Sequence, residues 1–258
     1  MIVTTSESPS ACTVNQANLL ASELQAAYVP RANKTIRALR ENWDADEIVV
    51  VGPREIRLMQ EGQPPFYFHP SMALVRLKRL IAGGKDTLVA VSGVMPGDSV
   101  LDCTAGLCSD SLVFSYAVGQ QGQVTALEAS RLLHAIVREG LRTYETGIPV
   151  IDQAMRAIQP VHGRHTEHLA SMRNNSVDVV YFDPMFERPV TTSSSMVPLR
   201  SQALREPLSA DAVREAIRVA RKKVVLKDHR DSGRFERLGF RLARVSASSV
   251  AYGVIDIE

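Results

Sequence analysis

Cysteine is scarce in this chain of 258 residues, and long hydrophobic runs are missing from it. The three cysteines, Cys12, Cys103 and Cys108, are few and odd in number, which argues against a disulfide framework and fits a reducing cytoplasm. No run of about 18 apolar residues occurs, so no membrane span is expected. The N-terminus lacks the basic and apolar regions of a signal peptide. We therefore expect a cytoplasmic protein with no membrane partner.

A strong charge of one sign is also lacking. The formal net charge is +2, which by itself implies no partner. The segment from Arg200 to Arg244 is different, because it contains 13 Lys and Arg residues against 6 Asp and Glu residues. Such an excess is either a footprint for a phosphate backbone or the solvated surface of helices.

Patterns that bind metals are sparse as well. His162, His165 and His168 recur at every third residue, but no Cys or pair of acids stands beside them. Loop histidines with ordinary hydrogen-bond partners are the more common outcome of such a pattern. We therefore expect no metal site.

The chain does contain enough apolar sequence for a sizeable core, since 45% of its residues are hydrophobic. From residue 98 onward, short β-branched strands alternate with helical patterns, which is typical of a doubly wound, mostly parallel α/β sheet. Residues 1–68 are expected to form a small N-terminal α/β domain. Residues 69–97 are expected to be a connecting helix and linker, and residues 98–258 the ligand-binding domain.

Three acids fall where strands of this expected sheet end: Asp102, Glu128 and Asp183. Ligands of doubly wound sheets bind outside the carboxyl ends of the strands. The three carboxylates are therefore candidates for one ligand site.

A turn of small residues, Thr104-Ala105-Gly106, follows the first of these strands. Small residues let the backbone approach a ligand closely, and the start of the next helix offers free N–H groups. A pyrophosphate would require three glycines, so a single glycine with a neighbouring acid suits a zwitterionic amino-acid ligand better. Asp102 or Asp110 would then face its ammonium group or organise the loop. The alternative is an ordinary strand-to-helix turn.

Glu128 ends the second strand, 22 residues after Gly106. A carboxylate at this place accepts hydrogen bonds from the ribose hydroxyls of adenosine-type and nicotinamide-type cofactors alike, or it caps the next helix. After the third strand, Arg164 or His165 lies in a loop where either could read the exocyclic amine of an adenine.

The Asp183-Pro184-Met185-Phe186 box carries the most specific chemistry. An aromatic amine is a poor nucleophile because its lone pair is delocalised into the ring. The Asp183 carboxylate and the Pro184 carbonyl can accept hydrogen bonds from its two N–H groups and so direct the lone pair toward a methyl donor. Phe186 can stack on the nucleobase that carries the amine. Positioning then does most of the work, so no strong general base is required. The alternative is a strand-ending turn with Phe186 in the core.

Three further residues are assigned to the substrate. Met185 belongs to the box, and Arg188 follows it in a polar segment that is either a mobile lid or a loop without a role. Lys227 stands at the expected end of a later strand, where it meets a substrate phosphate or is solvated.

At these residues the chain resembles the class I S-adenosylmethionine-dependent methyltransferases. Within them it resembles the bacterial 16S rRNA guanine-N2 methyltransferase group that carries this box, in which Met185 replaces a more usual second proline. The similarity covers residues 98–258 well and the rest loosely. The segments that carry it are Asp102–Leu107 with Asp110, Leu127-Glu128, Tyr181–Phe186, Lys222–Lys227 and Tyr252-Gly253.

The resemblance implies a seven-stranded Rossmann-like sheet, S-adenosylmethionine (SAM) as cofactor, and an RNA base, ribosomal guanine N2, as substrate. Besides the turn residues Asp102, Thr104 and Gly106, the implied cofactor contacts are Ser109, Asp110, Glu128, Ala129, Arg164, His165 and Asp183. The chain departs from the family at Cys108 and Ser109, where Gly and Arg are usual, and at Glu187-Arg188-Pro189. Its third-strand loop is also longer, so the adenine contact falls on His165 or Thr166.

Two other functions fit part of this pattern. A methyltransferase that acts on a small molecule or a protein would share the cofactor site. A non-catalytic RNA-binding module with a vestigial cofactor fold would bind RNA but not SAM. A nicotinamide-dependent dehydrogenase is disfavoured by the glycine pattern.

Overall fold

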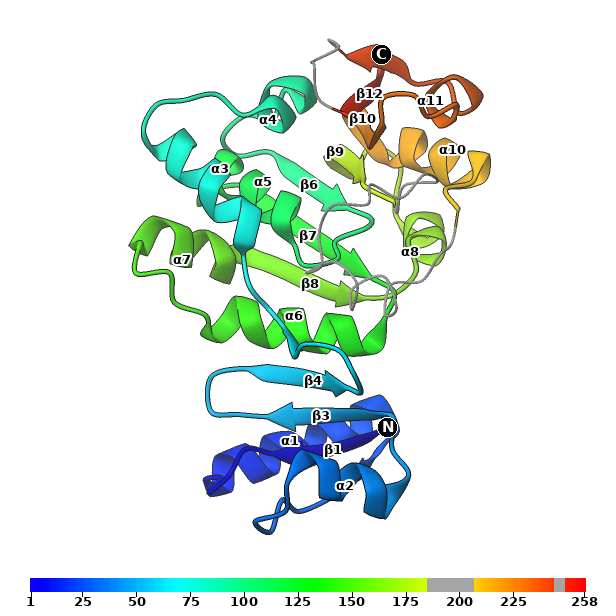
Figure 1. Ribbon diagram of the computed structural model, residues 1–258. Helices are drawn as coiled ribbons and strands as arrows, with labels where there is room; N and C mark the ends of the chain where they lie inside the picture. Colours follow the sequence, from blue (N-terminus) through cyan, green and yellow to red (C-terminus); the bar gives the residue numbers. More distant parts are fainter. Residues whose placement is uncertain (185–206, 244–248) are drawn as a thin grey trace.

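The computed structural model describes residues 1–184, 207–243 and 249–258, which form two β-sheets and the helices around them (Figure 1). The first sheet has the order β2-β1-β3-β4-β5 and the second the order β11-β12-β10-β9-β6-β7-β8. The strands of the first sheet are β1 (Ile2–Thr5), β2 (Ala27–Tyr28), β3 (Glu47–Val51), β4 (Ile56–Gln60) and β5 (Phe66–Tyr67). The strands of the second are β6 (Ser99–Asp102), β7 (Gln123–Glu128), β8 (Ile158–His162), β9 (Val177–Phe182), β10 (Ala220–His229), β11 (Arg241–Ala243) and β12 (Val250–Asp256).

Several helices begin at a residue suited to cap them. The side chains of Ser10, Thr35, Asp86, Ser130 and Ser209 each accept a hydrogen bond from a backbone N–H in the first turn of the helix that follows. The helices are α1 (Ala11–Leu24), α2 (Ile36–Trp43), α3 (Ser71–Ile81), α4 (Thr87–Ser92), α5 (Ser109–Val118), α6 (Arg131–Thr143), α7 (Pro149–Ala157), α8 (His165–Ser171), α10 (Ala210–Val219) and α11 (Arg234–Arg237). No helix of the described residues is long and apolar enough to cross a membrane.

The seven-stranded sheet has the predicted, mostly parallel architecture. Strands β10, β9, β6, β7 and β8 are parallel neighbours, whereas β12 is antiparallel to β10 and β11 is antiparallel to β12. From β6 the chain builds the sheet toward β7 and β8, and it then returns to the other side of β6 for β9 and β10. The switch point of the topology therefore lies between β6 and β9, where sheets of this kind bind ligands.

Strand β9 shows why both faces of this sheet are covered by helices. Its side chains alternate, so Val179 and Tyr181 pack with residues of α4 and α5, while Val180 and Phe182 pack with residues of α10. A strand that is buried on both faces reads as a continuous apolar run, which is the pattern seen before Asp183.

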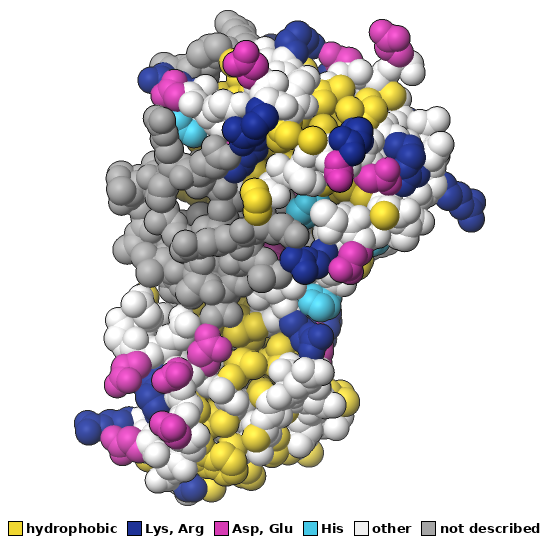
Figure 2. All heavy atoms as spheres, turned by 90° about the vertical axis from the view of Figure 1, so that its right-hand side faces the viewer, with side chains coloured by type: hydrophobic (Ala, Val, Ile, Leu, Met, Phe, Trp, Pro, Cys, Tyr) yellow, Lys and Arg dark blue, Asp and Glu magenta, His cyan; other side chains and the backbone are white. Residues whose placement is uncertain are grey.

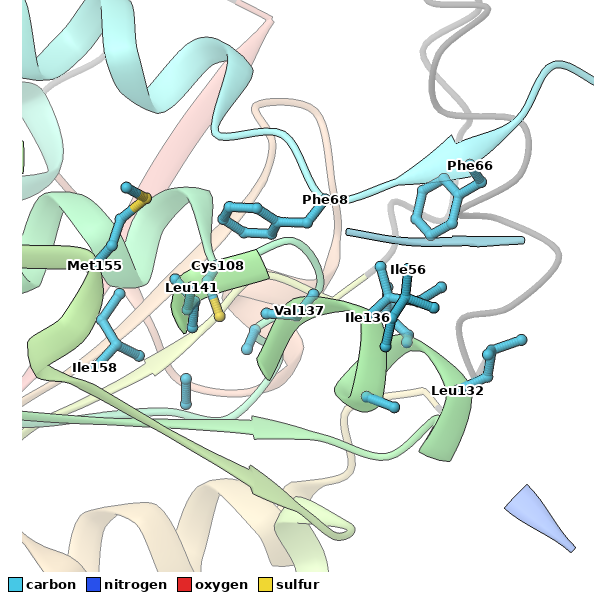
Figure 3. Close-up of a cluster of buried hydrophobic side chains, with 14 of the residues drawn as sticks. Ile56, Phe66, Phe68, Cys108, Leu132, Ile136, Val137, Leu141, Met155 and Ile158 are labelled. Atoms are coloured by element: carbon cyan, nitrogen blue, oxygen red, sulfur yellow. The ribbon is translucent and has the colours of Figure 1, made fainter. Parts of the chain in front are cut away.

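Helix α6 packs against both sheets, because it lies between β8 of the second sheet and β4 of the first (Figure 1). Figure 3 shows Ile56 and Phe66 of the first sheet beside Leu132 and Ile136 of α6, and all four belong to one buried cluster. Gly140 of α6 lies against the Phe68 ring, since a Cβ on this glycine would come within 2.1 Å of that ring. The first sheet is therefore packed firmly on the second through α6.

The structure corrects the expected place of two site residues. Lys227 does not end its strand, because β10 continues to His229 through antiparallel pairing with β12. His165 is not in a loop, because it is the first residue of α8. In helix α3, Ala73 and Leu77 are buried, whereas Met72 and Val75 are exposed.

Candidate cofactor and substrate site

The structure brings the three strand-ending acids to one edge of the sheet. Asp102 is the last residue of β6, Glu128 is the last of β7, and Asp183 directly follows β9. The three strands are parallel, and Asp102 is in register with Tyr181 of β9. These carboxyl ends point to the right in Figure 1 and flank the switch point of the topology.

Asp102 organises the turn that follows β6. Its buried carboxylate accepts hydrogen bonds from the Thr104 amide at 3.1 Å and from the Ser111 hydroxyl at 2.5 Å. Burial raises the pKa of Asp102 to about 7, although these two hydrogen bonds act in the opposite direction. Of the two roles expected for this acid, the geometry favours support of the loop over contact with a ligand.

The backbone of this turn is left-handed at two positions. Gly106 has φ +51° and Cys108 has φ +57°, the second of which is uncommon for a residue with a side chain. A Cβ at Gly106 would have no neighbour within 4 Å, so this side of the turn is open. The left-handed conformation at Cys108 explains why a glycine would suit this position. The open side at Gly106 leaves room for a ligand near Ser109, the half-buried first residue of α5.

Glu128 ties the same turn to β7. Its Oε2 accepts a hydrogen bond from the Gly106 amide at 3.1 Å, and its Oε1 accepts one from the Ser130 amide at 2.8 Å. Burial raises the pKa of Glu128. Each oxygen of a carboxylate has a second lone pair, and the side chain is only half-buried, so its chemistry fits the two hydroxyls of a ribose. Ala129, the next residue, is half-buried as well.

The residues expected at the adenine lie at the start of α8. Arg164 is exposed and precedes the helix, and His165 is buried with its ring edge-on to Phe182 at 5.7 Å between centroids. Thr166 is half-buried. These positions are at the carboxyl end of β8, next to Glu128, and their contact with an adenine remains a prediction.

Asp183 is fixed at its main chain and at its side chain. Its amide donates to the Thr104 hydroxyl at 2.5 Å, which connects the end of β9 with the turn after β6. Its Oδ2 accepts a hydrogen bond from Lys227 Nζ at 2.7 Å. Pro184 is buried behind it. The structure thus brings Thr104, Asp183 and Lys227 together, although they are far apart in the sequence.

Asp110 extends this contact into a network of buried charges. Its Oδ2 accepts hydrogen bonds from Lys227 Nζ at 2.8 Å and from the Tyr181 hydroxyl at 2.7 Å. Its Oδ1 is paired with the guanidinium of Arg76. Because both oxygens are held by protein donors, Asp110 organises the site, and any contact with a ligand ammonium remains a prediction.

The network sets the charges of its members in opposite ways. Burial works against a charged Asp110, but Lys227 and Arg76 outweigh it and hold the pKa of this acid well below its usual range. Burial raises the pKa of Asp183 to about 6, with Lys227 opposing the change and Asp110 adding to it. Lys227 itself has a raised pKa because its two carboxylates more than offset its burial. Asp183 is therefore a carboxylate at neutral pH that can still titrate.

Sequence reasoning missed Arg76 and Tyr181. Arg76 lies in α3, 34 residues before Asp110, and nothing in the sequence relates the two positions. The only signal is its place three residues after the buried Ala73, on the inner side of the helix. The predicted substrate residues Met185, Phe186 and Arg188 lie outside the described residues, and a contact of Lys227 with substrate remains a prediction.

The basic excess in the C-terminal part of the chain is largely paired with acidic residues of the same chain, and several of these pairs are on the surface. Most of its described cations have an acidic partner within 4 Å. The ion pairs include Arg214–Asp211, Arg218–Glu215, Arg221–Asp178, Lys222–Asp98, Lys223–Asp256, Lys227–Asp110, Lys227–Asp183, Arg230–Asp231, Arg234–Asp228 and Arg241–Asp256. The described parts of the chain contain no group of three or more His, Cys, Asp or Glu residues that could hold a metal ion.

Comparisons with known proteins address the family and the fold. A family model of SAM-dependent methyltransferases matches residues 37–237. A solved SAM-dependent methyltransferase from Neisseria gonorrhoeae covers 98% of this chain and 95% of its own, with a TM-score of 0.59 and 18% identity, so it supports the fold. The chain is also 42% identical over 254 residues to the uncharacterized protein YpiP of Bacillus subtilis. This match covers 98% of each of the two chains.

A more distant similarity concerns a named activity. The chain is 34% identical over 162 residues to ribosomal RNA small subunit methyltransferase J of Hahella chejuensis. This match spans 58% of the chain and 57% of that protein's length. The family model covers residues 37–237, which is most of the chain. The chain therefore belongs to the SAM-dependent methyltransferase family.

Proposed function

We propose that this methyltransferase transfers the methyl group to an exocyclic amine of an RNA base, with guanine N2 of ribosomal RNA as the favoured target. The observation that carries the proposal is the Asp183 carboxylate at the switch point of the sheet. Lys227 occupies its Oδ2, and among the described residues its Oδ1 has no hydrogen-bond partner. The side chain is 27% exposed, and we infer that Oδ1 accepts a hydrogen bond from a substrate N–H.

We also propose how the chain divides its work. SAM supplies the activated methyl group when it is bound. The turn from Thr104 to Gly106 would hold its amino-acid part, Glu128 its ribose, and the start of α8 its adenine. Residues 1–68 would form a small α/β domain and residues 69–97 a connection, while residues 98–258 would bind SAM.

The proposed mechanism relies on positioning. Asp183 Oδ1 and the Pro184 carbonyl would accept hydrogen bonds from the two N–H groups of the amine, so that its lone pair points toward the methyl group. Phe186 would stack on the base, which is a contact worth about 1–3 kcal/mol. A base inside a duplex cannot reach such a pocket, so the target must be unpaired or flipped out.

Two observations support RNA as the substrate class. Relatives with partial coverage are named ribosomal RNA small subunit methyltransferases. In addition, Arg131, His162 and Arg164 are exposed at the starts of α6 and α8 and at the end of β8, beside the proposed cofactor site. Figure 2 faces this edge, and its described surface shows basic and histidine side chains interspersed with acidic ones.

The test is methyl transfer from radiolabelled SAM to unmodified small-subunit ribosomal RNA. We expect label in the RNA, and an affinity for RNA that falls steeply with added salt because phosphate contacts release counterions. Label in a small molecule or a protein, but not in RNA, would favour a methyltransferase with that kind of substrate. The pairing of most cations of the C-terminal segment with acids of the same chain also favours this alternative. Binding of RNA without binding of SAM would identify a non-catalytic module.

A further inference from the structure

Arg76 is held at two places between α3 and the candidate site. Its Nε and Nη2 donate to the two oxygens of Asp86, both at 2.9 Å, and its Nη1 is paired with Asp110 Oδ1. Asp86 is itself fixed, because it caps α4 by accepting from the Leu88 amide at 2.9 Å. The guanidinium therefore has a defined position and only 18% of the side chain is exposed.

From Arg76 a continuous series of contacts leads to the proposed reacting carboxylate. Asp110 is 6% exposed and is paired with Arg76 through one oxygen and with Lys227 through the other. The Lys227 ammonium then binds Asp183 Oδ2. Each step is a charge-assisted hydrogen bond, and such bonds are stronger and more directional than neutral ones.

We propose that Arg76 is a positioning residue that sets the place and the charge of the Asp183 carboxylate through Asp110 and Lys227. The proposal rests on the proposed function of Asp183 and adds to it a residue outside the strands and turns that form the site. Arg76 would not contact the substrate. It would keep Asp110 from drawing Lys227 away from Asp183.

The physical reason is a balance of buried charges. Asp86, Asp110 and Asp183 are three acids, and Arg76, Arg79 and Lys227 are the three cations that contact them. Without Arg76, two neighbouring carboxylates share a single ammonium group. Like charges at short range disfavour ionisation, so Asp183, which is the more weakly stabilised of the two, would protonate at higher pH.

The other ionisable groups around Asp183 come from several strands. Burial raises the pKa of Tyr252 in β12 to about 12 and raises that of Tyr181 in β9, so both phenols stay neutral. Asp102 in β6 is different, since burial raises its pKa to about 7. It can titrate close to Asp183, and an experiment must tell the two acids apart.

A purely structural role for Arg76 makes a different prediction, and Arg79 provides the matched control. Arg79 is in the same helix and contacts the same Asp86, at 3.4 Å, but within the described part of the chain it forms no hydrogen bond or ion pair with Asp110. If α3 and α4 only need a cation on Asp86, Arg76→Met and Arg79→Met should act alike on Asp183. If Arg76 acts through Asp110, only Arg76→Met should change its titration.

The experiment is a carbon-13 NMR titration of the full-length protein labelled at its aspartate carboxyl groups, with the Asp183 signal assigned by its loss in Asp183→Asn. We expect a midpoint near pH 6 in the wild type and in Arg79→Met. In Arg76→Met we expect the midpoint to rise by about 0.5 pH unit or more. Arg76→Lys keeps the charge and should restore most of the wild-type behaviour.

Tyr181→Phe is the second variant, in case Arg76→Met does not fold. It removes one hydrogen bond to Asp110 and no charge, so a smaller rise of the same sign is expected. An Asp183 midpoint that is unchanged in every folded variant would overturn the proposal. If the midpoint moves but no RNA is methylated by the wild type, the proposed substrate is wrong while the control of Asp183 by Arg76 stands.

Discussion

The two ends of the seven-stranded sheet each carry a cluster of charged side chains, and they differ in how the charges are shared. At the amino end, Asp178 of β9 accepts hydrogen bonds from the amide and hydroxyl of Ser99 at 2.9 and 2.8 Å. Arg221 of β10 adds two more, at 3.1 and 2.8 Å. At the carboxyl end, Asp183 shares the ammonium group of Lys227 with Asp110.

This difference separates stabilisation from reactivity. Hydrogen bonds from Arg221 and Ser99 hold the pKa of Asp178 well below its usual range, so this acid is charged at neutral pH and both of its oxygens have partners. Burial raises the pKa of Asp183 to about 6. Lys227 binds one oxygen of this carboxylate, and the other oxygen has no hydrogen-bond partner among the described residues. The same sheet thus carries one acid that is fully paired and one, at the proposed substrate site, that is only partly paired.

Replacement of Asp183 by Ala should have the largest effect. We expect methyl transfer to fall by about 100-fold or more, because the amine loses the group that orients it. The affinity for SAM, measured by calorimetric titration, should change little, since Glu128 and the turn after β6 remain. Unchanged transfer would show that the carboxyl-end cluster is not catalytic.

The pH dependence of transfer is the next largest effect. Asp183 must be charged to accept an N–H, and burial raises its pKa to about 6. The single-turnover rate should therefore be level above this pH and fall about tenfold for each pH unit below it. A rate that stays level down to pH 4.5 would mean that Asp183 protonation does not matter.

The amino-end acid should behave in the opposite way. Replacement of Asp178 by Ala should lower the free energy of unfolding by about 1–2 kcal/mol, because the Ser99 amide loses its partner, while the exposed Arg221 limits the charge contribution. The rate of transfer and its pH profile should be unaffected. A variant as stable as the wild type in urea unfolding would remove the distinction between the two clusters.

The signs of the two pKa changes give a further check on stability. The folded pKa of Asp178 is depressed, so its contribution is present above its unfolded pKa of about 3.9 and is lost as the pH falls below that value. The folded pKa of Asp183 is raised, so its contribution is present at low pH and lost as the pH rises through about 6. Asp183→Asn should accordingly be no less stable than the wild type at pH 8.

The fold could be predicted because its signals are local. The apolar run of β9 and the acids at the strand ends follow directly from the neighbouring sequence, and the parallel sheet follows from the alternation of strands and helices. The end of β10 could not be predicted in this way. Its last residues are strand only because β12 pairs with them, as in the register of His229 with Val250.

The site could be predicted only in part. Asp102, Glu128 and Asp183 could be placed at one edge of the sheet because each stands at the end of a strand, and their contacts with ligands stay predictions. Arg76 was not, because its partner Asp110 is brought to it by the packing of α3 on α5, which no spacing in the sequence encodes.

We propose above all that a base amine is methylated at the Asp183 edge of the sheet. The most direct test is mass spectrometry of nucleosides from ribosomal RNA that this protein has methylated with isotopically labelled SAM. We expect the label in N2-methylguanosine, and we expect it to disappear when Asp183→Ala replaces the wild type. Label in a ribose 2′-O-methyl group or on a ring carbon would contradict it, because neither position has N–H bonds for Asp183 to accept.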